Sequence, residues 1–157
     1  MSERLEAIKA DLAAGRQRLN EVLDQIGDQW ETQVYADGLQ WNVRQLVNHL
    51  ADADRAQSNL VINLAEGKDI IPADFDLERY NRRVTEKTAE KSPDQSREEM
   101  AAQRQQLLTW LDVLDEAKLD LIGRHGSLNL LSITQILGVI ANHEHTHADD
   151  IAQALHL

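Results

Sequence analysis

The amino-acid sequence predicts an all-α protein, a four-helix bundle in which a shorter helix is inserted between the second and third long helices. Its apolar volume comes mainly from Leu, Ile, Val and Ala, and aromatic residues make up only 4% of the chain. Only two prolines and seven glycines are present to interrupt helices. Three stretches place a Ser or Asn three residues before a Gln, the capping-box pattern that starts helices: Asn42–Gln45, Ser92–Gln95 and Ser132–Gln135.

The first long helix is expected over residues 2–27, because apolar side chains recur there at helical spacing. Gly15 interrupts this segment and weakens it by about 1 kcal/mol relative to Ala. The apolar stripe comprises Leu5, Ile8, Leu12, Leu19, Val22, Leu23 and Ile26.

The second long helix is expected from Val43 to about Glu66, directly after the Asn42 cap. Gly67 follows it, and glycine is the residue most often found just past a helix end. Trp41 precedes the cap and is placed to pack against Leu46, as a hydrophobic staple does.

The remaining helices are predicted from their cap residues in the same way. Asp76 is a candidate cap for the shorter helix, over residues 77–90. The third long helix is expected over 93–116, since Pro93 suits a first helical position, and the fourth over 133–155. Strands around 128–131 stay an open alternative, but no apolar alternation is long enough to support a sheet.

The composition of the chain limits the functions that it can have. The length of 157 residues suits one domain spanning residues 1–157, and the net charge of −11 opposes binding to nucleic acids and anionic membranes. No stretch of about 18 apolar residues exists to span a membrane. The absence of cysteine excludes disulfides, thiolate ligands and a cysteine nucleophile. The charged N-terminus lacks the apolar core of a signal peptide, which fits a cytoplasmic protein.

Three histidines are candidates for a metal site. His143 and His147 are four residues apart on the face of the fourth helix that carries its apolar residues, so both point toward the core. His49 lies on the apolar stripe of the second helix, and it meets them if the two helices are neighbours. Three imidazoles leave coordination positions open for water or substrate, as in catalytic zinc sites. The alternative is a set of core histidines that are hydrogen-bonded to carbonyl or carboxylate oxygens.

The other histidines are expected to be unimportant for such a site. His145 points to the opposite side of its helix and is expected at the surface. His125 sits in a loop flanked by glycine, where solvent exposure is the default, and His156 lies at a frayed helix end.

Carboxylates near these histidines are candidates for supporting roles. Asp150 follows His147 by three residues and can serve as a fourth ligand, a general base, or an acceptor that orients an imidazole. Asp52 stands in the same relation to His49. Glu144 is offset from the histidine pair by about 100° and is a second candidate base. For each acid, a solvated position on the helix surface is an equally good reading.

The segment His143–His147 also matches H-E-x-x-H, a motif of zinc proteases. The metzincin form of that motif would require Gly at position 150 and His at position 153. Asp150 and Gln153 stand there instead, so this match is interpreted as coincidental.

Two motifs together resemble the DinB/YfiT-like superfamily. The segment from Trp41 through His49 to Ala53 resembles its first histidine motif, and the segment 143–151 is similar to its closing motif. The resemblance implies a four-helix bundle that holds zinc or nickel on His49, His143 and His147. It also implies a homodimer, and an activity among either hydrolases or enzymes that use low-molecular-weight thiols such as mycothiol, bacillithiol or glutathione. Asp150 departs from the small or amide residue expected at its position.

The leading hypothesis is a metal-dependent enzyme, a thiol transferase or a hydrolase, that acts on a small molecule. Asp150 or Glu144 would act as its base. The alternatives are a non-catalytic bundle that binds a metal or small ligand, and a member with empty histidines that serves as a dimeric interaction or stress-response module.

Overall fold

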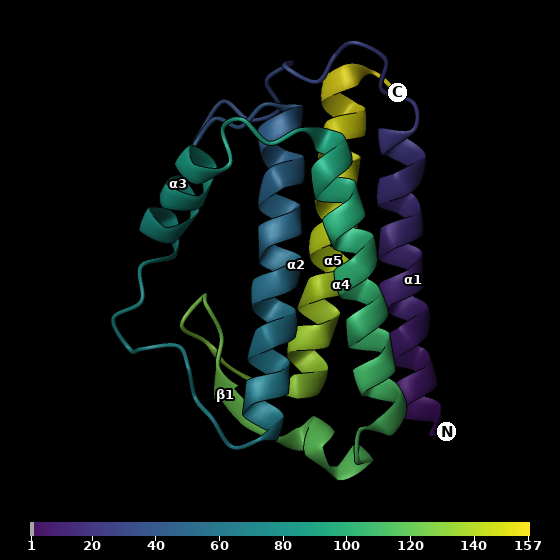
Figure 1. Ribbon diagram of the computed structural model, residues 1–157, viewed down its shortest axis with the longest axis vertical. Coiled ribbons are helices and arrows are strands. Elements are labelled where there is room, and N and C mark those ends of the chain that lie inside the picture. Colours follow the sequence, from purple (N-terminus) through teal and green to yellow (C-terminus); the bar gives the residue numbers. More distant parts are fainter. Residues whose placement is uncertain (1) are drawn as a thin grey trace.

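Four long helices form the molecule in the computed structural model, which describes residues 2–157 (Figure 1). The expectation of an all-α bundle with one inserted helix is confirmed. The long helices are α1 (Glu3–Leu23), α2 (Val43–Ala65), α4 (Pro93–Val113) and α5 (Ile133–Leu155). The inserted helix is α3 (Leu77–Lys87), and a short 3-10 helix η1 (Glu116–Asp120) with strands β1 (Ile122–Arg124) and β2 (Leu130–Ser132) joins α4 to α5.

The order of the helices in space differs from their order in the chain. α5 packs against both α1 and α2, and α2 packs against α4. Figure 1 shows α1 and α5 running in one direction and α2 and α4 in the other. The connection from α2 to α4 therefore returns along the length of the bundle, and α3 lies on this return, outside α2. The two histidine-bearing helices, α2 and α5, are antiparallel neighbours.

The caps predicted from the sequence are formed. Asn42, Ser92 and Ser132 each make a complete capping box with the Gln three residues later. Asp76 accepts a hydrogen bond from the Arg79 backbone N–H, and Gly67 adopts the positive φ of 78° that ends α2.

Three helices end earlier than predicted. α1 stops at Leu23, because the backbone N–H groups of Gln25 and Ile26 bond three residues back, in a tighter turn that breaks the α-helical pattern. α4 stops at Val113, because Leu114 adopts an extended conformation and Asp115 caps the 3-10 helix that follows. α3 stops at Lys87, where Thr88 leaves helical geometry. Apolar residues continue at helical spacing through such turns, so the sequence pattern does not show where these helices end.

A two-stranded antiparallel hairpin, the alternative left open by the sequence, is present before α5. It pairs Ile122 with Ser132 and Arg124 with Leu130. Each strand is only three residues long, which is too short to show a two-residue period. No helix within residues 2–157 is long and apolar enough to cross a membrane.

The core is divided along the bundle axis into two apolar clusters with a polar layer between them. One cluster joins the first half of α1 to the first half of α5, and includes Leu12 and Ile136. The other joins their second halves, and includes Leu19 and Ile151. The buried charged side chains of the chain come from segments between these clusters, as do the candidate metal ligands of α5. The buried charged residues are Asp54, Arg104 and Glu144.

Gly15 has a packing role that its helix propensity does not reveal. A Cβ atom at this position would lie 2.5 Å from the carbonyl oxygen of Ala141 on α5. We expect Gly15→Ala to destabilise the protein by about 1–3 kcal/mol, because overpacking against backbone outweighs the gain in helix propensity. Urea denaturation measures the change.

Gly138→Ala is the matched control, because nothing lies within 4 Å of a Cβ at that exposed helical position. It should raise the free energy of unfolding by up to about 1 kcal/mol. An equal gain from Gly15→Ala would refute the close approach of α1 to α5.

Candidate metal centre

Three imidazoles converge between α2 and α5. The Nε2 atom of His143 lies 3.2 Å from that of His49 and 2.9 Å from that of His147. The three potential ligand atoms all lie within 4.8 Å of one another. Within residues 2–157, neither Asp150 nor Glu144 belongs to this group. The structure thus brings together the three histidines that the sequence singled out.

The surroundings of the histidines favour their neutral form. Burial lowers the pKa of His143 to about 3, with a further contribution from a charge on His147, and burial lowers the pKa of His147 to about 4. The pKa of His49 is also far below its usual value, because of burial and the two neighbouring imidazoles. A neutral imidazole keeps the lone pair that a metal ion needs.

Tyr35 links His147 to Asp150. Its hydroxyl oxygen lies 2.6 Å from Nδ1 of His147, and its O–H donates a hydrogen bond to the Asp150 carboxylate. When Nε2 of His147 is the ligand atom, Nδ1 carries the proton and donates to Tyr35. Burial, and then the hydrogen bond and charge of Asp150, raise the pKa of Tyr35, so the phenol keeps its proton. Of the three roles considered for Asp150, this geometry favours orientation of an imidazole.

Trp41 fixes the ring of His49. The two rings stack with centroids 4.3 Å apart and planes 25° apart, and the indole N–H donates to the Thr85 hydroxyl at 3.0 Å. Trp41 also belongs to the apolar cluster that contains Leu46. Its contact with His49 was not expected, because Trp41 precedes the helix and helical spacing does not apply to it.

Glu144 is neither solvated nor free. It is only 1% exposed, and it accepts hydrogen bonds from Arg16 Nη2 at 2.7 Å and Arg104 Nη2 at 2.9 Å. The same two nitrogens bond Asp54, at 3.3 Å and 3.2 Å. Burial alone would lower the pKa of Arg16, but the hydrogen bonds and charges of Glu144 and Asp54 together outweigh it and raise that pKa. We call these four residues the charge quartet, and their contacts rule out the alternative reading of Glu144 as a solvated acid on the helix surface.

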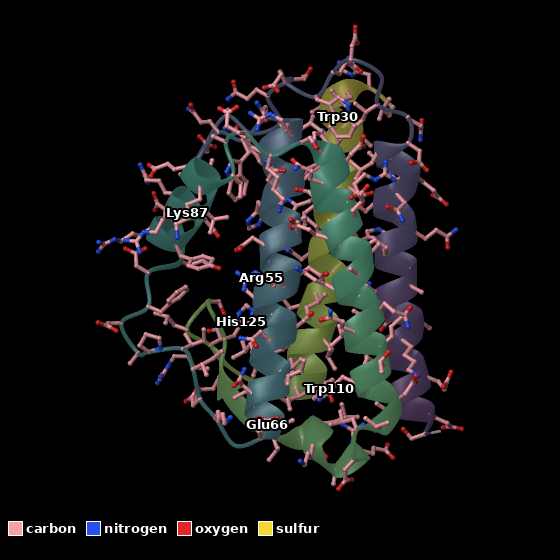
Figure 2. All side chains as sticks on the ribbon, viewed as in Figure 1. Trp30, Arg55, Glu66, Lys87, Trp110 and His125 are labelled. Carbon is pink, nitrogen blue, oxygen red and sulfur yellow. The ribbon has the colours of Figure 1, made fainter. Side chains whose placement is uncertain are left out.

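Of the remaining polar candidates, one lies where the sequence predicted and two do not. His145 is exposed beside Asp149, as expected. His125 is half-buried rather than solvated, because the hairpin folds back on α2 and brings His125 Nε2 within 2.8 Å of the Gln57 side-chain oxygen (Figure 2). Burial lowers the pKa of His125. Asp52 accepts hydrogen bonds from Tyr80 and Arg55, not from His49.

Cavities on the surface of the described residues include two with a well-defined lining. The larger, about 410 Å³, lies between α1 and α4 and has Arg16 and Arg104 of the charge quartet in its lining. The smaller, about 320 Å³, lies between the loop before α2 and the start of α3, and includes Tyr35 and Trp41. Because these two residues contact His147 and His49, the smaller cavity adjoins the histidine cluster on the side where Tyr35 and Trp41 support it.

Comparison with known proteins agrees with the geometry. The sequence profile described as the DinB superfamily matches residues 6–151. The chain belongs to the DinB superfamily. No curated protein matches this DinB sequence.

Solved structures that share the fold include two whose descriptions name an activity. One is YfiT from Bacillus subtilis, described as a probable metal-dependent hydrolase with an unusual four-helix bundle topology. It is 20% identical, with a TM-score of 0.79 over 99% of this chain and 89% of that one. The other is a mycothiol-dependent maleylpyruvate isomerase, 15% identical, with a TM-score of 0.77 over 96% of this chain. The DinB chain spans 63% of that isomerase. At these identities the likeness establishes the fold.

Proposed function

We propose that this DinB protein is a metal-dependent enzyme in which His49, His143 and His147 hold one zinc or nickel ion. The observation that carries the proposal is the convergence of three neutral imidazole nitrogens, with no carboxylate in the group. Neutral nitrogen donors suit both metals, and a set of three leaves the coordination sphere open.

A bound cation would lower the pKa of a water or thiol, so that a nucleophile is available at neutral pH. The protein's own residues act around it. Tyr35 and Asp150 hold the proton on His147 Nδ1, which directs Nε2 toward the centre of the site. Trp41 restrains the ring of His49 by stacking. We assign Asp150 a positioning role and Glu144 a structural one.

Two reaction types suit this arrangement, transfer of a small thiol to an electrophile and hydrolysis. The fold relative described as mycothiol-dependent supports thiol transfer, and the one described as a probable metal-dependent hydrolase supports hydrolysis. We further propose that the protein is a homodimer, which light scattering tests. Assays that pair small thiols with a chloronitrobenzene, and hydrolysis of simple esters and amides, separate the two reactions.

Elemental analysis of tag-free protein tests the metal site. We expect about one zinc or nickel ion per chain in the wild type and its loss in His147→Ala, because two imidazoles hold a metal far more weakly than three. His145→Ala is the matched control on the same helix and should retain the metal. Equal loss in both variants, or no uptake by the wild type after reconstitution, would contradict the proposal.

A further inference from the structure

The smaller cavity has a mixed apolar and hydrogen-bonding lining. Its wall comes from Tyr35, the loop that follows it, and the first turns of α3. Figure 1 shows this loop arching over one end of the bundle toward α3. The apolar part of the lining is Leu39, Trp41 and Leu77. At about 320 Å³, the cavity is at the lower end of the range for small-molecule sites.

The polar side chains in this cavity are acidic or neutral rather than cationic. No Lys or Arg lines it, whereas Asp37, Glu78 and Asn81 do. Among the described residues, the side chains of Asp37 and Asn81 have no hydrogen-bond or ion-pair partner. Glu78 bonds Arg82 at 2.9 Å in an exposed pair, which leaves part of its charge available. The local charge therefore favours a ligand that brings a positive charge and N–H donors.

The loop that carries Asp37 is held in an unusual conformation. Gln40 has a φ of 53°, a left-handed value that costs free energy for a residue with a side chain. Gly38 has a φ of 63°. Hydrogen bonds from the Gln40 backbone N–H to Asp37 O and from its amide to Ala36 O hold this turn closed. The turn sets Asp37 and Leu39 in the same cavity wall.

We propose that this cavity binds the organic substrate of the enzyme, and that the substrate is a primary ammonium compound with a small apolar body. The apolar body would pack on Leu39, Trp41 and Leu77, and the ammonium group would donate to Asp37 and Asn81. As a substrate site it rests on the proposed function. Binding of such a compound is argued from the cavity lining alone, because none of the three histidines lines the cavity.

Calorimetric titration with phenethylamine and phenylpropionate tests the proposal, since the two probes share one apolar body and carry opposite charges. We expect the amine to bind about tenfold more tightly, through attraction for one probe and repulsion of the other. Asp37→Asn should weaken amine binding about threefold to fivefold, the size of one partly exposed ion pair. Amide NMR shifts on adding the amine should concentrate in residues 35–41 and 77–81.

Asp69→Asn is the matched control, because it removes the same charge from an exposed position outside the cavity lining. It should leave amine binding unchanged. Equal weakening by both variants, tighter binding of the carboxylate, or no binding of the amine would overturn the proposal. Titrations of zinc-loaded and of chelated protein separate the ligand-binding proposal from the proposed function. Amine binding in both forms supports ligand binding in the cavity even where no metal is taken up. Metal uptake without amine binding refutes ligand binding in the cavity and leaves the metal site supported.

Discussion

Replacing Glu144 with alanine is expected to lower the free energy of unfolding by about 3–5 kcal/mol, because the change leaves buried guanidinium charge without its main acceptor. Glu144 accepts three hydrogen bonds, two from Arg16 and one from Arg104. Asp54 remains in Glu144→Ala, but a single carboxylate cannot balance both Arg104, which is buried, and Arg16, whose side chain is 14% exposed. Urea denaturation of the metal-free protein measures the loss.

Asp149→Ala provides the matched control on the same helix. Its partners Arg18 and His145 are partly exposed, so this variant should lose no more than about 1 kcal/mol. A second comparison separates structure from catalysis. If Glu144→Gln retained full stability and metal content but lost activity, Glu144 would be the catalytic base, and our structural assignment would be wrong.

Acid is expected to unfold the metal-free protein well above the pH at which carboxylates titrate. An unfolded histidine takes up a proton near pH 6.5, whereas His143 and His147 in the folded protein resist protonation until about pH 3 and pH 4. Between these values the unfolded state binds more protons, so stability falls as pH falls. Each of the two histidines contributes a slope of up to about 1.4 kcal/mol per pH unit.

Urea denaturation in the presence of a chelator, at intervals from pH 7.5 to pH 4.5, measures this slope. His143→Gln should reduce the slope, because it removes one of the groups that resist protonation. His145→Gln, at an exposed position of the same helix, should leave it unchanged. Identical slopes in the wild type and His143→Gln would contradict the assignment. Zinc should raise stability most at neutral pH, because protons compete with the metal for the imidazoles.

Much of the fold and the histidine cluster could be predicted because both follow from local rules. The three capping boxes locate helix starts through contacts that span only three residues. The spacing of His143 and His147 places both on one helix face whatever surrounds that helix. The inward stripe of α2 does the same for His49. The resemblance to the DinB/YfiT-like superfamily supplied the adjacency of α2 and α5.

The parts of the site that were missed depend on long-range contacts. Tyr35 and Trp41 come from a loop, where no periodicity indicates the direction of a side chain. The charge quartet did leave a signal in the sequence. Arg16 follows Leu12 by four residues and precedes Leu19 by three, so it occupies a position on the apolar stripe.

The other three members of the quartet obey the same rule. Arg104 lies between Met100 and Leu107, Asp54 follows Leu50 by four residues, and Glu144 precedes Ile151 by seven. Two positive and two negative residues on inward stripes of four helices indicate a buried ionic cluster. Which charges meet could not be read from the stripes, because that depends on how the helices are aligned along the bundle.

Helices carry the metal ligands, whereas much of the cavity wall comes from the segments that connect helices, and this difference has an evolutionary consequence. The three histidines stand on α2 and α5, whose positions are fixed by both apolar clusters. The walls of the adjoining cavity come partly from the loop before α2, whose Trp41 belongs to the packed core, and partly from α3, which has no buried residue. Substitutions in the exposed loop positions and in the α3 part of these walls can accumulate with little penalty in folding. A lineage built on this scaffold can therefore change the compounds it recognises while it inherits the metal ligands intact.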